Sequence, residues 1–224
     1  MARLNIVVEG HTEETFARLV LSNHLAPRGV LVNQRRIITG RKGARAYRGG
    51  MTSFARAERD IREWLAEDKS AWVTTMFDFY GLPVDFPGQD AARNAVDSNA
   101  SIQILEKNLA DAINDRRFIP YIQKHEFEAL LFSDISVIDQ ALMPVSSRSQ
   151  LKLLQLIRSD FKTPEDIDNN PDTAPSKRLI GIYAGYDKEA WGTVISTRIG
   201  VDRIRAECPH FNQWLTHLES IGVF

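Results

Sequence analysis

Short apolar runs alternate along the first part of the chain with longer stretches in which apolar residues recur at helical spacing. The runs are rich in β-branched and aromatic residues and predict four strands. They are "LNIVV" (4–8), "VLVNQRRII" (30–38), "AWVTTMF" (71–77) and "RFIPYIQ" (117–123). Amphipathic helices are predicted directly after the first run, at 53–67 and at 99–114. Strands that alternate with helices of this size indicate βαβ units, so we expect an α/β fold whose mostly parallel four-stranded sheet is flanked by helices.

The pattern changes from about residue 145 onward. "LKLLQLI" has helical spacing, "TPEDIDNNPDTAPS" is a polar loop, and helices are predicted around 188–207 and 209–220. We therefore expect an α/β core over 1–140 and a mainly helical C-terminal extension over 141–224 that packs on the core as a helical layer.

Composition limits the partners and the compartment. The 224 residues carry 28 Lys and Arg against 29 Asp and Glu, so any affinity for nucleic acid must come from a local basic cluster. The single cysteine, Cys208, excludes an internal disulfide and fits a reducing cytoplasm. No apolar run is long enough for a membrane span, so we expect a cytoplasmic protein with no membrane partner. The oligomeric state is open.

Acidic residues stand at the ends of the predicted strands. Glu9 follows the first run and Asp78 follows the third, while Glu126 and Glu128 in "HEFEALL" come shortly after the fourth. Ligands of an open parallel sheet bind outside the carboxyl ends of its strands, and converging carboxylates are typical ligands of Mg²⁺. The pattern therefore favours a metal site. The alternative is that Glu9 caps the next helix and Asp78 begins a turn.

Four sequence blocks carry a resemblance to a known family. "VVEGHTEETF" resembles the first motif of Toprim domains, which topoisomerases, primases and overcoming-lysogenization-defect (OLD) nucleases share, and "MFDFYGLP" resembles the second. Together with "HEFEALLFSD" and "IRAECPHFNQWL", these blocks are similar to an uncharacterised bacterial Toprim-like family, domain of unknown function 4276. The resemblance covers nearly the whole chain and implies a Toprim-like α/β fold.

The resemblance also implies metal-dependent phosphodiester chemistry with Mg²⁺ or Mn²⁺. The implied catalytic residues are Glu9, Asp78, Glu126 and Lys188, with Lys177 as an alternative to Lys188. The implied metal ligands are Glu9, Asp78, Glu126 and Glu128.

Tyr80 departs from this family pattern, because it stands where the second motif has another Asp. A phenol is a poor Mg²⁺ ligand, so Glu13 and Asp85 are candidate substitutes. Tyr80 itself is expected to hydrogen-bond a phosphate, to stack on a base, or simply to pack at the strand end. His125 is a secondary candidate for proton transfer or phosphate contact, or else a structural hydrogen-bonding residue.

A basic, glycine-rich stretch at 35–50, "RRIITGRKGARAYRGG", is the main candidate for nucleic-acid contact. It contains no acid and is expected to be a loop that contacts a phosphate backbone, or a solvated loop with no ligand. The predicted nucleic-acid-binding residues, which include two cations of "PSKRL", are Arg35, Arg36, Arg41, Lys42, Arg45, Arg48, Lys177 and Arg178.

These features together favour an enzyme, a Mg²⁺-dependent nuclease that acts on DNA or RNA. The resemblance implies an ATPase partner and a role as the effector of a bacterial phage defence system. The first alternative is a catalytically degenerate Toprim module that docks on nucleic acid or on an ATPase. The second, a small-molecule phosphohydrolase, is disfavoured because the chain has no nucleotide-binding fingerprint.

Overall fold

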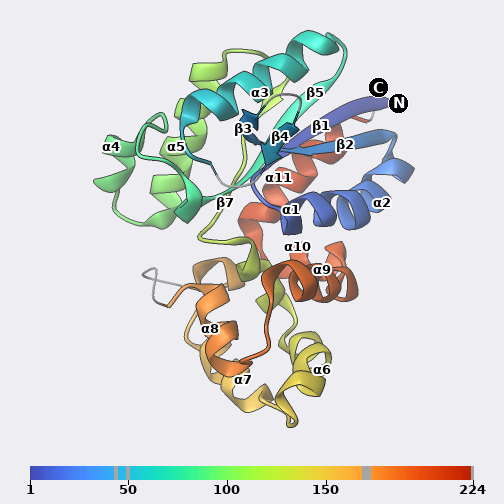
Figure 1. Cartoon of the computed structure of the whole chain (residues 1–224), viewed down its shortest axis with the longest axis vertical. Helices are drawn as coiled ribbons and strands as arrows, with labels where there is room; N and C mark the ends of the chain where they lie inside the picture. The colour runs from blue at the N-terminus through green and yellow to red at the C-terminus, as the bar shows by residue number, and fades with distance from the viewer. Residues whose placement is uncertain (43–44, 49–50, 168–172, 223–224) are drawn as a thin grey trace. The chain divides into compact units, whose positions relative to one another are not determined.

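The computed structural model describes residues 1–42, 45–48, 51–167 and 173–222, with the backbone alone over 38–42 and 45–48. The chain divides into two compact units, shown in Figure 1. The sheet unit comprises Met1–Gln123 and Leu218–Phe224, and the helical unit comprises Lys124–His217. The division into these units falls after Gln123; the expected core over 1–140 and extension over 141–224 stay a prediction.

The main sheet is parallel throughout and confirms the α/β expectation. Its strands run in the order β2-β1-β5-β6, and β7 pairs with β5 beyond β6. The strands are β1 (Ala2–Val8), β2 (Val30–Arg36), β5 (Trp72–Asp78), β6 (Phe118–Ile119) and β7 (Ile122–Gln123). β1 and β5 are buried over most of their length, as expected for central strands covered on both faces.

The predicted fourth strand is divided into β6 and β7, so the sheet has five strands instead of four. Pro120 lies between the two pieces and has no N–H to donate to the ladder. The side chain of Thr75 takes over the pairing there, because its hydroxyl accepts from the Tyr121 N–H and donates to the Tyr121 carbonyl, both at 2.9 Å. The strand edge is thus held by a side chain where the backbone ladder is interrupted.

Helices cover the sheet within this unit. Those predicted at 53–67 and 99–114 are confirmed as α3 (Phe54–Glu67) and α5 (Ser98–Ile113). Ile61 and Trp64 of α3 join Leu105 and Leu109 of α5 in one apolar core with Phe77 of β5. The remaining helical segments are α1 (His11–Phe16), η1 (Ala17–Leu21), α2 (Ser22–Leu25), η2 (Ala26–Arg28), η3 (Phe79–Gly81) and α4 (Gln89–Arg93).

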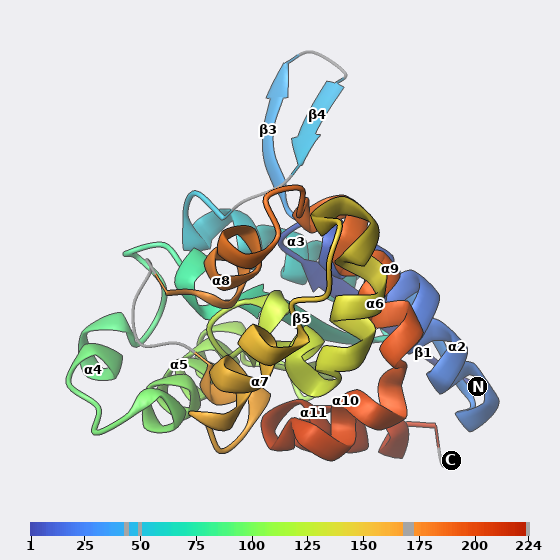
Figure 2. The same ribbon diagram turned by 90° about the horizontal axis from the view of Figure 1, so that it is seen from below.

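The basic stretch contains an antiparallel hairpin, which corrects the expectation of a loop. The second predicted strand ends at Arg36, and the chain then forms β3 (Ile38–Lys42) and β4 (Arg45–Arg48). Figure 2 shows the two strands side by side, extending away from the main sheet. Glycines and basic residues are compatible with a two-stranded ribbon as well as with a loop, so the composition of this stretch did not distinguish the two.

The helical unit consists of α-helices and short 3-10 turns. These are η4 (Phe127–Ser133), α6 (Ile135–Ser146), α7 (Leu151–Ser159), η5 (Pro164–Asp166), α8 (Pro175–Ile182), α9 (Lys188–Ile199), α10 (Val201–Glu207) and α11 (Pro209–Ser220), whose last three residues, 218–220, belong to the sheet unit. Among the described residues, no single helix is long and apolar enough to cross a membrane, although η4 and α6, bent by 105°, pass that test as a pair.

Candidate functional site

Two of the predicted acids lie at the carboxyl ends of neighbouring strands. Glu9 directly follows β1, and Asp78 is the last residue of β5. The parallel register pairs Val8 with Met76, so these two strands end at the same edge of the sheet. Both acids are partly exposed. The structure therefore brings Glu9 and Asp78 to one open edge, where a parallel sheet binds its ligands.

Gly81 forms the floor beneath Glu9. A β-carbon built on Gly81 would overlap both carboxylate oxygens of Glu9 and would lie 2.7 Å from its Cδ. The Glu9 side chain consequently rests on the bare backbone of η3, the short turn that continues from Asp78. This contact ties the two strand ends together. Sequence reasoning missed Gly81, since "YGLP" looks like an ordinary turn.

Two further groups reach the same edge from α1 and β2. Glu13 is buried, and its carboxylate folds back over Gly10, where an added β-carbon would lie 2.5 Å from Oε2. Arg36 is level with Val8 in the β1–β2 register and forms an ion pair with Glu14 at 2.9 Å. The edge therefore presents a cation on β2, an acid after β1 and an acid at the end of β5, in that order.

The turn after β5 contains the residue that departs from the family pattern. Tyr80 is partly exposed, and its ring lies 5.6 Å from the ring of Phe79, tilted by 43°. Phe79 packs against the core of the sheet unit. The Tyr80 ring thus packs on Phe79, which directly follows Asp78 and is itself held by the core.

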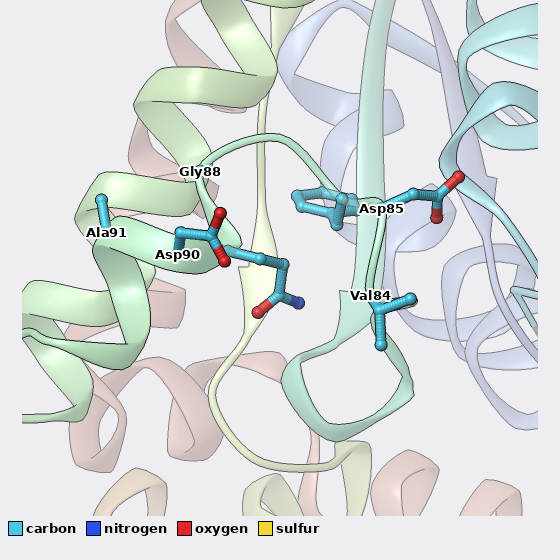
Figure 3. Close-up of a pocket in the computed structure, with 7 residues that line it drawn as sticks. Val84, Asp85, Gly88, Asp90 and Ala91 are labelled. Carbon is cyan, nitrogen blue, oxygen red and sulfur yellow. The ribbon is translucent and has the colours of Figure 1, made fainter.

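Asp85, the candidate substitute for the missing metal ligand, binds the backbone at the start of α3. Both of its carboxylate oxygens accept from the Phe54 N–H, at 3.0 and 3.1 Å, which fixes the start of α3. Figure 3 shows Asp85 beside a hollow of about 440 Å³. The hollow is lined by Val84, Asp85, Phe86, Gly88, Gln89, Asp90 and Ala91.

The remaining predicted acids meet the predicted lysine in the helical unit. The ammonium group of Lys188, at the start of α9, lies 3.3 Å from Glu126 Oε1 and 3.0 Å from Glu128 Oε2. Glu126 also accepts from the Ser176 N–H at 3.1 Å, and the Tyr186 hydroxyl donates to Glu128 at 3.5 Å. Burial, followed by the charge of Glu128, raises the pKa of Tyr186. Tyr186 and Ser176 were not anticipated, because both are distant from "HEFE" along the chain.

His125 lies beside this group, and its backbone is in an unusual conformation. Its φ is +63°, in the left-handed region that residues with a side chain seldom adopt, and the residue is buried. Such strain persists only where surrounding contacts fix it, and it concentrates at functional positions.

The predicted nucleic-acid contacts are only partly described. The Arg35 guanidinium lies 4.4 Å from the centre of the Trp64 ring and donates to the Asp60 carbonyl, so it helps to hold β2 to α3. On α8, Lys177 is exposed, while Arg178 donates to the Thr173 carbonyl. The side chains of Arg41, Lys42, Arg45 and Arg48 lie outside the described part of the chain.

The acids at the strand ends are the candidate ligands of a magnesium ion. Over the described ranges, no group of three or more His, Cys, Asp or Glu side chains is arranged to hold a metal ion. Mg²⁺ is often bound by only one or two carboxylates, with water and substrate phosphate as its other ligands. Glu9 and Asp78 fit that smaller set. The larger predicted set, which adds Glu126 and Glu128 of the helical unit, stays a prediction.

Comparison with known proteins gives structural and family matches. The mercury-phased structure of the C-terminal region of the OLD protein from Xanthomonas campestris pv. campestris is 16% identical, over 99% of this chain and 97% of that chain, with a TM-score of 0.45. The iodine-phased structure of the same region is 17% identical, over 99% and 96%, with a TM-score of 0.43. No curated protein matches significantly. The model of the family described as "Domain of unknown function (DUF4276)" matches residues 8–219, and the chain therefore belongs to the DUF4276 family.

Proposed function

We propose that this protein is a Mg²⁺- or Mn²⁺-dependent nuclease that hydrolyses phosphodiester bonds in DNA or RNA. The observation that carries the proposal is the meeting of Glu9 and Asp78 at one edge of a parallel sheet, with Glu9 seated on Gly81. The resemblance of "VVEGHTEETF" and "MFDFYGLP" to Toprim motifs supports the same chemistry.

Each residue has a defined part in this proposal. Glu9 and Asp78 would hold the metal ion, which when bound polarises a phosphate and lowers the pKa of a water molecule. Gly81 keeps the Glu9 carboxylate in place. Arg36, on the next strand, attracts the phosphate backbone, and the hairpin and α8 add sequence-independent affinity. The family resemblance gives Lys188, in the helical unit, the part of stabilising negative charge on a phosphate.

The biological setting is part of the proposal. We infer that the protein acts in the cytoplasm with an ATPase partner, as the effector of a bacterial phage defence system. This inference is supported by the resemblance of the four sequence blocks to the Toprim-like family.

A catalytically inactive binding module is the second candidate. It is favoured by Tyr80 in place of an acid and by the ion pairs that Lys188 makes with Glu126 and Glu128. A lysine that neutralises two acids provides the positive charge that a second metal ion would otherwise supply.

One experiment separates the two candidates. Purified protein is incubated with plasmid, linear and single-stranded nucleic acids in Mg²⁺, Mn²⁺ or EDTA, alongside Glu9→Gln and Asp78→Asn. The nuclease requires cleavage that depends on the metal and is lost in both variants, with weaker Mn²⁺ binding measured by calorimetry. Cleavage that persists in both variants would rule out this site. Salt-sensitive binding without cleavage, unchanged by EDTA, would support the binding module.

A further inference from the structure

The turn that follows β5 carries a partly exposed tyrosine at the ligand-binding edge of the sheet. η3 places Phe79, Tyr80 and Gly81 directly after Asp78. Phe79 packs against the apolar core of the sheet unit. Among the described residues, Tyr80 is not a member of that core. Tyr80 is partly exposed and is supported from one side by the Phe79 ring.

The position of Tyr80 is fixed with respect to the acids. It lies between Asp78 and Gly81, and Gly81 is the residue on which the Glu9 carboxylate rests. Tyr80 therefore belongs to the same short turn as the residue that supports Glu9, directly beyond the strand that ends at Asp78. A tyrosine at this position offers a flat apolar face where a carboxylate would offer only charge.

Charge along the edge separates a phosphate side from a base side. The strand order puts Arg36 of β2, which is ion-paired with Glu14, on one side of Glu9 and the turn after β5 on the other. Adjacent strands lie about 4.8 Å apart, so the two sides are separated by about 10 Å. Beyond Tyr80 the chain continues to a hollow whose lining includes Asp85 and Asp90 and no cation (Figure 3). A strand whose phosphates face Arg36 would direct its bases toward Tyr80.

We propose that Tyr80 is a base-stacking residue and that the edge binds single-stranded nucleic acid in preference to a duplex. Stacking on a side chain requires an unpaired base whose face is open, and every base has such a face. A paired duplex offers no free base to the ring. This inference rests on the proposed function, because it names the substrate class of the same site.

The test measures binding without cleavage. The probe is a single-stranded DNA of about 12 nucleotides that contains one 2-aminopurine, offered alone or annealed to its complement, in EDTA. Binding is followed by anisotropy, and stacking by quenching of the 2-aminopurine fluorescence. The variants are Tyr80→Phe, Tyr80→Leu and Tyr80→Ala. Val84→Ala, on the same loop and 83% exposed, is the matched control.

The expected result is quenching on binding, with tighter binding of the single strand than of the duplex. Tyr80→Phe keeps the affinity and the quenching, while Tyr80→Leu and Tyr80→Ala lose the quenching and bind roughly tenfold more weakly. Val84→Ala behaves as the unmodified protein, and thermal melting verifies that every variant is folded.

The outcomes distinguish this inference from the proposed function. Unchanged binding and quenching in folded Tyr80→Ala, or equal affinity for duplex and single strand, would overturn the stacking role even if metal-dependent cleavage is found. Stacking without cleavage in Mg²⁺ or Mn²⁺ would support the inference and contradict the nuclease. Absence of binding to either probe would contradict both.

Discussion

The carboxylate of Glu9 rests on the backbone of Gly81, so close that a β-carbon at Gly81 would lie 2.7 Å from the Glu9 Cδ. Glycine is needed here for close approach and not for its conformational freedom, because Gly81 is not among the glycines with positive φ. An alanine at position 81 could therefore adopt the backbone conformation, but its β-carbon would overlap the Glu9 carboxylate.

Gly81→Ala is expected to displace the Glu9 carboxylate while the fold is retained. We predict a loss of at least about tenfold in Mn²⁺ affinity or in cleavage rate, because metal ligands tolerate little misplacement. Gly181→Ala is the matched control, since a β-carbon there meets no atom within 4 Å. Gly181 lies inside α8, so this control is expected to raise stability by about 0.5–1 kcal/mol. Normal metal binding and cleavage in Gly81→Ala would contradict the role of this contact.

Asp166→Asn is expected to destabilise the protein, because Lys124 would lose its charged partner. The Lys124 ammonium lies 2.5 Å from Asp166, and its side chain is only 3% exposed. We expect a loss of about 3 kcal/mol in the free energy of unfolding, the lower end of the range for a broken buried pair, since Asp166 is 31% exposed. Denaturant unfolding measures this change. The double variant Lys124→Met with Asp166→Asn is expected to recover part of the loss, and an equal loss in both would argue against the pairing.

Acid is expected to lower stability through Asp139 and Asp166. Burial opposes ionisation of both carboxyls. Hydrogen bonds from Ser149, Gln150 and Tyr183 to Asp139, and the hydrogen bond and charge of Lys124 at Asp166, nevertheless lower each pKa below 3.8. A lowered pKa in the folded state contributes stability above the unfolded value, and that stability is lost as the pH falls through the folded value. The melting temperature should therefore fall below about pH 4, and less steeply in Asp139→Asn.

Glu165 is expected to have the opposite pH dependence. Burial raises its pKa above 4.5 against the hydrogen bonds from the His210 and Phe211 N–H groups. A raised pKa means that the folded state binds the proton more tightly, so Glu165 favours folding as the pH falls toward 4.5. Glu165→Gln should remove this contribution from the dependence of the melting temperature on pH. An unchanged pH dependence in this variant would contradict the raised pKa of Glu165.

Lys188 and Glu128 are expected to be coupled in stability. Lys188→Met leaves Glu128, whose side chain is 2% exposed, without its cation. We predict that adding Glu128→Gln to this variant costs less than it does alone, with a coupling energy of about 0.5–3 kcal/mol from a double-mutant cycle. Additive losses would indicate that the ion pair contributes nothing to folding.

The local sequence pattern was sufficient to predict the main strands and helices of the sheet unit. The runs at 4–8 and 71–77 are mostly apolar, and each is followed directly by an acid. A strand can therefore be assigned together with the acid at its end, and parallel pairing then brings Glu9 and Asp78 to one edge. The helices α3 and α5 were likewise clear from their apolar spacing.

Contacts between residues distant in sequence could not be predicted from local sequence patterns. Nothing in "YGLP" indicates that Gly81 supports Glu9, and nothing in "YDKEAWG" indicates that Lys188 pairs with two glutamates some 60 positions earlier. The hairpin was missed because basic residues and glycines are as common in loops as in short ribbons. These features depend on how elements pack, which single-sequence periodicity does not encode.

The hydroxyl of Thr75 has a consequence for the outer margin of the sheet. The strand it supports forms an outer margin of the main sheet, and an intact outer strand offers a row of backbone groups to which a second molecule can add. Pro120 interrupts that row, and Thr75 compensates for the pairing lost inside the molecule. The protein thereby keeps its fold at this margin, and Phe118, Ile119, Tyr121 and Ile122 are buried there and closed to a second molecule.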